Sequence, residues 1–341
     1  MRVAGRLTAF AAAGGMVAAV VVLTAGLAPA PHVPLASHGR LAPALSAGHT
    51  AASSASPTLR PAIASPAPSA QPVLQAVRAI SAPRHIQAAG GALADVGTMQ
   101  MLWSRNLGTE RPMGSITKVM TALVVIQEGH LNQLIKIPKS VLAYVAKYQA
   151  ESAGLHPGDV LTAQQLLEAM LLPSGCDAAY VLALTYGPGM PAFLAKMNAM
   201  ARALGMLHTH FTSPDGLPYP TEYSTYSTPS DLLTLGLAAM TLPVFRSIVD
   251  QPFVHVFKSK LHHAYWWDNT NGLIGNYQGA IGIKTGYTDA AGHCLLFEAV
   301  RHGVTLIGVV LGSPATNPYT ASAAAARLLN WGFGLKALSS G

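Results

Sequence analysis

Ser115 and Lys118 are side chains whose types and spacing could perform chemistry. They are three residues apart, so a helix would place them on one face. A serine hydroxyl becomes a good nucleophile when a neighbour accepts its proton. A lysine accepts that proton once burial, a second cation or a helix N-terminus favours the neutral amine. Because chance also produces on the order of one such pair in a chain of this composition, an N-capping serine beside a surface lysine stays open as the alternative.

A second cluster, Lys284-Thr285-Gly286, lies at the end of a predicted strand. An amine, a hydroxyl and free backbone groups at a strand edge suit a carboxylate ligand. The glycine lets a ligand approach the backbone closely. An ordinary strand that ends in a turn explains the same residues equally well.

A third cluster, Ser174-Gly175-Cys176-Asp177, lies between two predicted helices. A serine in such a loop could relay a proton to a leaving group. As a helix entry, Ser174 or Asp177 could instead be an N-cap.

Predicted strands and helices must position these clusters. Near-alternate apolar residues over 92–104 predict a strand, and a helix is expected over 115–128 with Gly129 as its stop. Further helices are predicted over 161–172, 178–184, 190–204, 230–240 and 321–331, and further strands over 253–257, 280–285, 294–300 and 305–311. This order predicts an α/β (α+β) fold in which an antiparallel sheet carries a helical insertion.

The formal net charge of +7 lies almost entirely outside this framework. The first 94 residues hold six arginines and no acidic residue, whereas the other 15 basic and all 14 acidic residues nearly balance. This distribution argues against a basic nucleic-acid-binding domain. A hydrophobic content of 50% also excludes disorder of the whole chain.

The N-terminal segment predicts export. Arg2 and Arg6 precede an apolar stretch over residues 7–27, and Ala28-Pro29-Ala30 resembles a cleavage site. Because this stretch is longer than the usual ~7–15 residues, an uncleaved membrane anchor stays open beside a signal peptide over residues 1–30. Residues 31–92 are rich in alanine, proline and serine, which predicts a disordered linker.

The order of the three clusters resembles the penicillin-recognising serine enzymes. The surrounding residues resemble the D-alanyl-D-alanine carboxypeptidase family of low-molecular-weight penicillin-binding proteins. The segments that carry this resemblance are 118–122, 173–175, 177–179, 197–198, 204–206, 215–217, 226–228, 282–288, 291–294 and 306–312. The resemblance implies a penicillin-binding, serine β-lactamase-like fold over residues 93–335, with an inserted all-helical subdomain and a tail over 336–341.

The resemblance also implies an activity, the removal of the terminal D-Ala from peptidoglycan stem peptides through an acyl-enzyme. Ser115 is expected to attack the penultimate D-Ala carbonyl, with Lys118 as general base. Ser174 is expected to pass the proton to the departing D-Ala. The backbone N–H groups of Ser115 and Tyr287 are expected to form the oxyanion hole.

The remaining implied contacts concern the substrate. Lys284, Thr285 and Gly286 are expected to bind its terminal carboxylate, with Cys176 as a further contact. Penicillin and other β-lactam antibiotics are expected to be covalent inhibitors, and neither a metal nor a cofactor is implied. Water as acceptor gives a carboxypeptidase and an amine gives a transpeptidase. The expected location is extracytoplasmic, at the cell wall, with an N-terminal membrane anchor as an alternative to secretion.

Cys176 departs from the family, most of whose members have asparagine at this place. A thiol donates and accepts hydrogen bonds weakly, while an amide does both strongly. We therefore hypothesise that Cys176 weakens hydrolysis relative to transfer. A catalytically weak penicillin-binding protein of the cell wall, on the same fold, is the alternative function.

Two other residue pairs could have suggested further sites. His208 and His210 flank Thr209 in a predicted extended segment, and a structural pair is favoured over a metal site. Cys176 and Cys294 are the two cysteines of the chain, and they are expected to remain free thiols rather than to form a disulfide.

Overall fold

A computed structural model describes residues 82–339 of the chain. The expected export signal and most of the expected linker lie outside the described residues. The strand β1 begins at Gly90, so residues 90–92 belong to the folded part and not to the linker. At the other end, the helix α8 continues to Ser339 and includes most of the expected tail.

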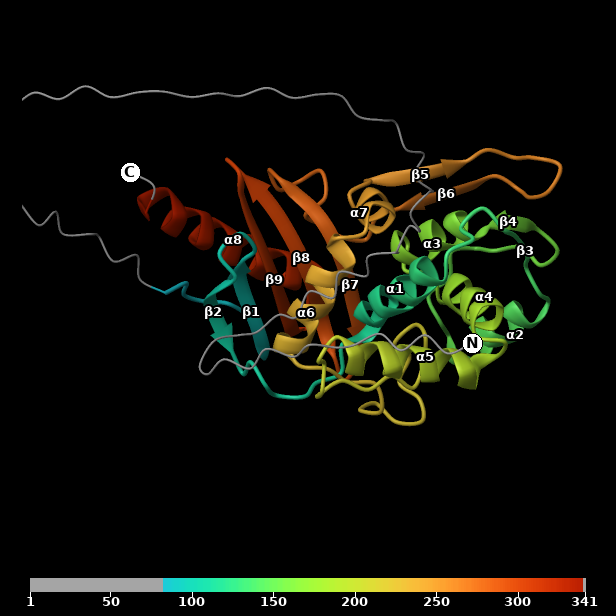
Figure 1. The fold of residues 1–341 in the computed structure, drawn as a ribbon, viewed down its shortest axis with the longest axis horizontal. Helices are drawn as coiled ribbons and strands as arrows, with labels where there is room; N and C mark the ends of the chain where they lie inside the picture. The colour runs from blue at the N-terminus through green and yellow to red at the C-terminus, as the bar shows by residue number, and fades with distance from the viewer. Residues whose placement is uncertain (1–81, 340–341) are drawn as a thin grey trace, which may run out of the picture. The chain divides into compact units, whose positions relative to one another are not determined.

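Five antiparallel strands form the main sheet, in the order β2-β1-β9-β8-β7 (Figure 1). Their bounds are Gly90–Asp95 for β1, Gln100–Arg105 for β2, Ala280–Thr288 for β7, Gly292–Arg301 for β8 and Val304–Ser313 for β9. The three predicted C-terminal strands are thus confirmed. Because β7 is the last strand in this order, one of its edges is free to face another part of the molecule.

The prediction of one continuous strand over 92–104 is wrong. A turn at residues 96–99 divides this segment into β1 and β2, which pair as a hairpin. The Asp95 carboxylate accepts hydrogen bonds from the backbone N–H groups of Gly97 and Thr98 and stabilises the turn. The apolar alternation continues on both sides of the turn, so it did not reveal the break.

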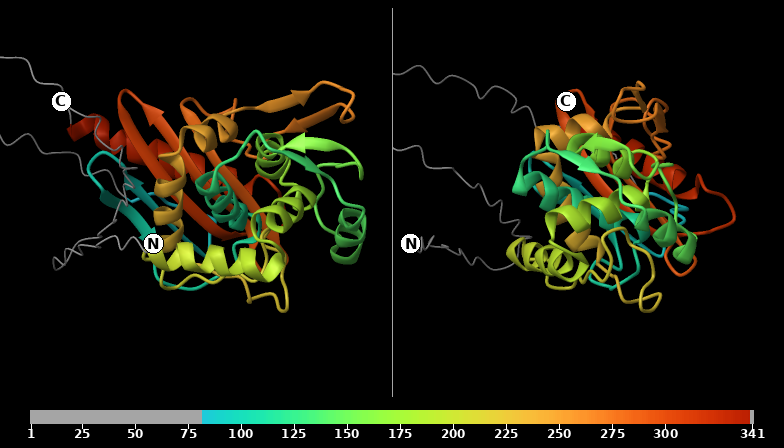
Figure 2. Two further views of the ribbon diagram at one scale, coloured as in Figure 1. Left: turned by 45° about the vertical axis from the view of Figure 1, so that its right-hand side comes forward. Right: turned by 90° about the vertical axis from the view of Figure 1, so that its right-hand side faces the viewer.

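Helices cover both faces of the sheet (Figures 1 and 2). The helix α8, Thr320–Ser339, packs on the face that carries Leu295 and Phe297. Leu296 points to the opposite face, where α1 and α6 pack. Since successive side chains of a strand alternate between faces, a sheet covered on both sides needs the continuous apolar run found in β8.

Most of the other helices belong to the insertion between β2 and β7, which lies beside β7 in Figure 1. The bounds of the inserted elements are Gly114–Thr117 for the 3₁₀ turn η1, Lys118–Glu128 for α1, Leu134–Lys136 for β3, Ser140–Tyr148 for α2, Val160–Thr162 for β4, Ala163–Leu171 for α3, Cys176–Tyr186 for α4, Met190–Ala203 for α5, Pro229–Met240 for α6 and Pro243–Val249 for α7. The predicted sheet with a helical insertion is confirmed, but the expectation of an all-helical insertion is wrong, because β3 and β4 pair within it as a two-stranded sheet.

Several boundaries differ from the prediction. Ser115 lies in η1, and the α-helix begins at Lys118. The predicted helix over 161–172 begins at Ala163, because the residues before it pair with β3 as β4. Thr162 and Gln165 form a capping box there. The helices α2 and α7 were not predicted, since α2 is largely exposed and α7 has seven residues.

A two-stranded hairpin projects from the insertion. It consists of β5, Phe253–Val256, and β6, Tyr265–Asp268. The predicted strand over 253–257 is confirmed. Its partner strand β6 carries three consecutive aromatic residues, of which Trp266 is exposed while Tyr265 and Trp267 are buried.

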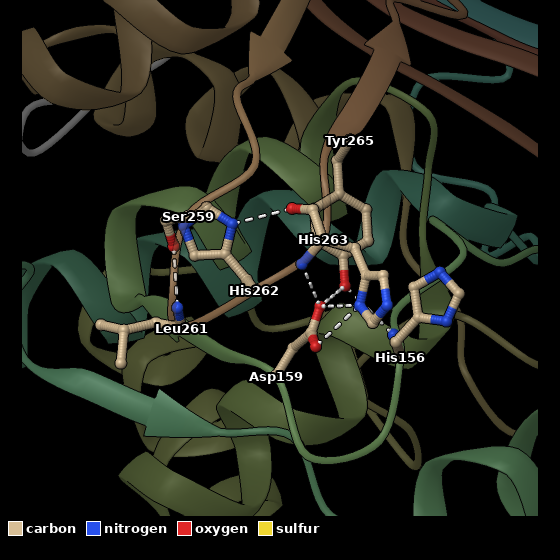
Figure 3. A network of polar contacts seen from close by, with 7 residues as sticks. All are labelled: His156, Asp159, Ser259, Leu261, His262, His263 and Tyr265. Carbon is tan, nitrogen blue, oxygen red and sulfur yellow. Dashed lines mark hydrogen bonds and ion pairs between the residues drawn. The ribbon is translucent and has the colours of Figure 1, made fainter.

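Asp159 ties this hairpin to the insertion (Figure 3). Its carboxylate accepts hydrogen bonds from the Tyr265 hydroxyl at 2.5 Å and from the backbone N–H of His263 at 2.9 Å. The His263 ring nitrogen Nδ1 lies 2.9 Å from the same carboxylate. Burial by itself would raise the pKa of Asp159, but the bonds from Tyr265 and His263 outweigh it and hold the pKa below its ordinary value.

Among the residues from 82 to 339, no single helix has both the length and the apolar composition needed to cross a membrane. Two bent helix pairs, α4 with α5 and α6 with α7, reach that threshold by length and composition when each pair is taken together.

The Asp159 network makes a prediction about stability. Asp159→Asn is expected to lower the free energy of unfolding at pH 7 by about 1–3 kcal/mol, because it removes charge-assisted hydrogen bonds. A carboxyl group whose pKa is lowered by folding stabilises the protein above its ordinary pKa of 3.8, and this contribution is lost as the pH falls through the folded-state value. Urea unfolding of both proteins at pH 7 and pH 3 measures the difference.

Asp250→Asn is the matched control, since Asp250 is an exposed carboxyl group at the end of α7. We expect it to change the free energy of unfolding by less than about 0.5 kcal/mol. An Asp159→Asn protein whose deficit is as large at pH 3 as at pH 7 would contradict the assignment.

Candidate active site

The three clusters singled out in the sequence converge on one cleft of about 720 Å³. The predicted site residues that line it are Ser115, Ser174, Cys176, Thr285, Gly286 and Tyr287. Three elements supply them, namely η1, the connection from α3 into α4, and β7. Lys118 and Lys284 are buried and lie next to these lining residues.

The pair Ser115 and Lys118 is joined through η1. The Lys118 ammonium nitrogen Nζ lies 2.7 Å from the Ser115 hydroxyl oxygen. Lys118 has 0% of its surface exposed, whereas Ser115 lines the cleft. The alternative of an N-capping serine beside a surface lysine is therefore wrong: Lys118 is buried, and no side chain caps η1 or α1.

Two further acceptors surround the Lys118 amine. Its Nζ lies 3.0 Å from the carbonyl oxygen of Asp215 and 3.3 Å from Cys176 Sγ. A buried amine is costly unless it is hydrogen-bonded. The three contacts together satisfy it and direct it toward the cleft.

Cys176 is the first residue of α4. The loop between α2 and β4 holds it in place. The Asp177 carboxylate accepts hydrogen bonds from the backbone N–H groups of Ala153 and Leu155. The Cys176 N–H donates to the Glu151 carbonyl at 2.8 Å. These bonds attach residues 151–155 to the start of α4 and orient the Cys176 side chain toward Lys118.

Ser174 precedes α4 in a left-handed backbone conformation, with a φ of 68°. It is 7% exposed and lines the cleft. The position of N-cap belongs to Gly175, and no side chain caps this helix. The alternative of Ser174 or Asp177 as an N-cap is therefore wrong.

Lys284 lies on β7, beneath the cleft, with 1% of its surface exposed. Its Nζ lies 3.2 Å from the hydroxyl oxygen of Thr285 and 3.2 Å from the Thr285 carbonyl oxygen. Burial, together with the positive charge of Lys118, lowers the pKa of Lys284 well below its ordinary value. A neighbouring carboxylate would stabilise its charged form.

Glycines allow η1 and β7 to approach at backbone distance. A Cβ atom on Gly286 would lie 2.2 Å from the Met113 carbonyl oxygen and 3.2 Å from the Ser115 nitrogen. A Cβ atom on Gly114 would lie 2.6 Å from the Tyr287 nitrogen. The backbone nitrogens of Ser115 and Tyr287 therefore lie at the same narrow junction, as the oxyanion-hole prediction requires.

Some cleft residues were not predicted from the sequence. They are Tyr148, Gln149, Ala150, Glu151, Leu217, Pro218, Glu222, Thr270, Gly272, Thr288, Asp289, His293, Cys294, Pro318, Tyr319, Ala321 and Ser322. Many of them lie in loops, where no periodicity signals a position. Asp215 was also not predicted as a site residue. The signal that could have indicated it is an acidic side chain in the segment 215–217, which resembles the family.

The other candidate pairs do not form sites among the described residues. His208 Nδ1 lies 3.3 Å from the Glu110 carboxylate at an exposed position. His210 makes a backbone bridge to Tyr226. Within residues 82–339, no group of three histidine, cysteine or acidic side chains could hold a metal ion. Cys176 and Cys294 are free and buried, so the expectation of free thiols is confirmed.

Burial of the two thiols makes a prediction about their reactivity. Burial raises the pKa of Cys176 to about 12 and that of Cys294 to about 12. Because the thiolate is the reactive form, neither cysteine is expected to react with a disulfide reagent at pH 8 in the folded protein. The same titration in urea should give two thiols per chain, and rapid reaction of the folded protein would contradict the prediction.

Known proteins support the identity of this cleft. The model of the D-alanyl-D-alanine carboxypeptidase family matches residues 76–315. The D-alanyl-D-alanine carboxypeptidase of Streptomyces sp. (strain K15) is 40% identical over 263 residues, which are 73% of this chain and 88% of that protein. The D-alanyl-D-alanine carboxypeptidase DacB2 of Mycobacterium tuberculosis is 40% identical over 246 residues, which are 71% of this chain and 81% of that protein.

The fold has a solved counterpart. The crystal structure of the Streptomyces K15 DD-transpeptidase superimposes with a TM-score of 0.70 at 38% identity, over 74% of this chain and 100% of that chain. The matched residues include all three clusters that meet in the cleft. This chain belongs to the D-alanyl-D-alanine carboxypeptidase family.

Proposed function

We propose that this protein is a serine-type D-Ala-D-Ala carboxypeptidase that acts on peptidoglycan stem peptides through an acyl-enzyme. The single observation that supports it most is the 2.7 Å distance between the Ser115 hydroxyl and the Nζ of the fully buried Lys118. A hydroxyl in reach of a buried amine is an activated nucleophile. Family membership identifies the bond that such a nucleophile breaks.

Acylation begins when the neutral Lys118 amine takes the proton of Ser115. The Ser115 oxygen then forms a bond to the carbonyl carbon of the penultimate D-Ala. The peptide bond to the terminal D-Ala breaks, and the proton moves from Lys118 through the Ser174 hydroxyl to the departing amine. The products are an ester at Ser115 and free D-Ala.

Two features of the cleft assist this step. Lys284, Thr285 and Gly286 bind the terminal carboxylate, whose negative charge stabilises the buried Lys284 ammonium. The backbone N–H groups of Ser115 and Tyr287 stabilise the oxyanion, and each such donor contributes about 2.7–4 kcal/mol to transition-state stabilisation.

The acceptor decides the outcome of the second step. Attack of water on the ester releases the shortened peptide, which is the carboxypeptidase reaction. Attack of an amine from a second stem peptide forms a new peptide bond, which is the transpeptidase reaction. A β-lactam acylates Ser115 in the same way, and the product blocks the cleft.

Peptidoglycan substrates place this reaction outside the cytoplasm. We infer that residues 1–30 direct export, either as a cleaved signal peptide or as a membrane anchor, and that the linker from residue 31 to the start of β1 at Gly90 tethers the enzyme to that end of the chain. Mass spectrometry of the mature N-terminus distinguishes cleavage after Ala30 from retention of the whole segment.

A second candidate function rests on Cys176. A thiol replaces the amide that most family members have, so one hydrogen bond to the substrate is weaker. A protein that binds penicillin and peptidoglycan but turns over slowly would result. Release of D-Ala from a diacyl-D-Ala-D-Ala peptide is expected of the enzyme and not of this binding protein.

The first test of function uses a fluorescent penicillin. We expect a covalent adduct with the wild-type chain and none with Ser115→Ala, because the nucleophile is lost. Ser140→Ala, which changes an exposed serine at the start of α2, should label as the wild type does. Labelling of Ser115→Ala would overturn the assignment of the nucleophile.

The second test concerns the acceptor. Cys176→Asn is expected to raise hydrolysis relative to transfer several-fold, because the amide restores a strong hydrogen bond beside Lys118. The ratio of hydrolysed to transferred product is measured with one peptide donor in water, with and without an amine acceptor. Cys176→Ala, which removes the thiol without adding an amide, should keep the wild-type ratio. An unchanged ratio in Cys176→Asn would contradict the hypothesis that Cys176 weakens hydrolysis relative to transfer.

A further inference from the structure

The direction of the Lys118 amine depends on groups that the reaction scheme does not use. A neutral amine has two N–H donors and one lone pair. The carbonyl oxygen of Asp215 and Sγ of Cys176 lie at 3.0 Å and 3.3 Å and accept the two donors. The third direction of the nitrogen is toward the Ser115 hydroxyl oxygen, 2.7 Å away, and in the neutral amine that the proposed mechanism requires this direction holds the lone pair. The position of the Asp215 carbonyl therefore decides whether the lone pair of Lys118 points at the hydroxyl proton of Ser115.

A tight turn over residues 213–217 presents this carbonyl. The Thr121 hydroxyl of α1 donates to the Pro214 carbonyl. Gly216 has a φ of 88°, and a Cβ atom there would lie 2.0 Å from the Gly114 carbonyl oxygen. The turn is thus held against α1 and η1 at backbone distance.

The Asp215 side chain fastens the other side of the turn. Its carboxylate accepts a hydrogen bond from the Tyr144 hydroxyl at 2.6 Å and another from the backbone N–H of Leu217 at 3.1 Å. Asp215 is 1% exposed. A buried carboxylate without such donors would be strongly unfavourable. The Tyr144 hydroxyl therefore stabilises the Asp215 carboxylate and holds the turn in position.

Aromatic packing keeps Tyr144 in position. Its ring stacks on Tyr180 of α4 with a centroid distance of 4.3 Å. The ring of Tyr148 meets it edge-on at 4.9 Å. Burial, and then the nearby Asp215 carboxylate, raise the pKa of Tyr144. Its hydroxyl therefore remains a hydrogen-bond donor across the working range of pH.

We propose that Tyr144 and Asp215 are positioning residues that aim the Lys118 amine at the nucleophile. The Tyr144 hydroxyl fixes the Asp215 carboxylate, the fixed turn presents the Asp215 carbonyl, and that carbonyl holds one N–H of Lys118. This inference rests on the proposed role of Lys118 as general base.

The first test removes the hydroxyl of Tyr144. Tyr144→Phe is expected to acylate with a fluorescent penicillin about tenfold more slowly, because the turn and its carbonyl are no longer fixed. Tyr277→Phe is the matched control, since it removes a hydroxyl that donates to a side-chain oxygen of Asn330 at 2.8 Å outside the cleft. It should acylate at the wild-type rate. Wild-type acylation by Tyr144→Phe would overturn the proposal.

The second test replaces the Asp215 carboxylate and keeps the shape of the side chain. In Asp215→Asn, the hydrogen bond from the Tyr144 hydroxyl is weaker, so we expect the maximal rate of acylation by penicillin to fall about tenfold, while the penicillin concentration that gives half of this rate stays within about twofold of the wild-type value. A variant whose half-saturating concentration rises while its maximal rate is unchanged shows a role in the shape of the cleft alone and overturns the proposal. This test also decides the matter if Tyr144→Phe does not fold.

Failure of this inference is distinct from failure of the proposed function. If the wild-type chain is labelled at Ser115 and both variants behave as the wild type does, the function stands and the positioning role is wrong. If the wild-type chain is not labelled, the role of Lys118 as base is wrong, and the positioning role is wrong with it.

Discussion

A buried lysine amine beside a serine hydroxyl is the interaction on which the rest of this structure depends. Lys118 is fully buried, and an amine in that position must find hydrogen-bond partners or destabilise the fold. Its partners come from three separate segments, which are η1, the start of α4 and the turn at Asp215. The fold must bring these segments within about 3 Å of one atom, and this requirement constrains the packing of the whole insertion.

The second buried lysine adds to that constraint. Lys284 approaches from β7 and lies close enough to Lys118 for their positive charges to repel, as the lowered pKa of Lys284 indicates. Burial, together with the nearby charge, disfavours the charged form of Lys284 in the empty cleft. A carboxylate beside it would stabilise that form, which is the contact proposed for the terminal D-Ala. Lys118 and Lys284 therefore affect both the stability of the fold and the proposed recognition of the substrate.

Backbone contact, more than side-chain contact, sets the geometry between the sheet and the insertion. Gly286 and Gly114 lie where a Cβ atom would collide with the opposing chain. Because β7 is an edge strand, its free side is available for this approach. The helices and the sheet can therefore meet at a distance that side chains would prevent. The cleft lies along this contact between the helices and the sheet.

Much of this could be predicted from residue patterns alone. Apolar segments located β7, β8 and β9, and the order of the clusters at Ser115, Ser174 and Lys284, with the family resemblance around them, predicted the site. The hairpin turn after Asp95 was missed because the alternation runs through it. The helix α2 was missed because it has only nine residues and no side chain caps its start. Neither error affected the predicted site, since the three clusters are recognised by local spacing.

The sequence by itself predicted the chemistry, because the order of Ser115 with Lys118, Ser174, and Lys284 with Thr285 and Gly286 resembles that of the D-alanyl-D-alanine carboxypeptidase family. It also determined that the folded part is nearly neutral, since most of the positive charge lies in the first 94 residues. The tertiary structure decided which contacts surround the base. Tyr144 and Asp215 are 71 residues apart along the chain and meet at 2.6 Å. Such a contact depends on how α2 packs against a distant turn, and no local pattern encodes that packing.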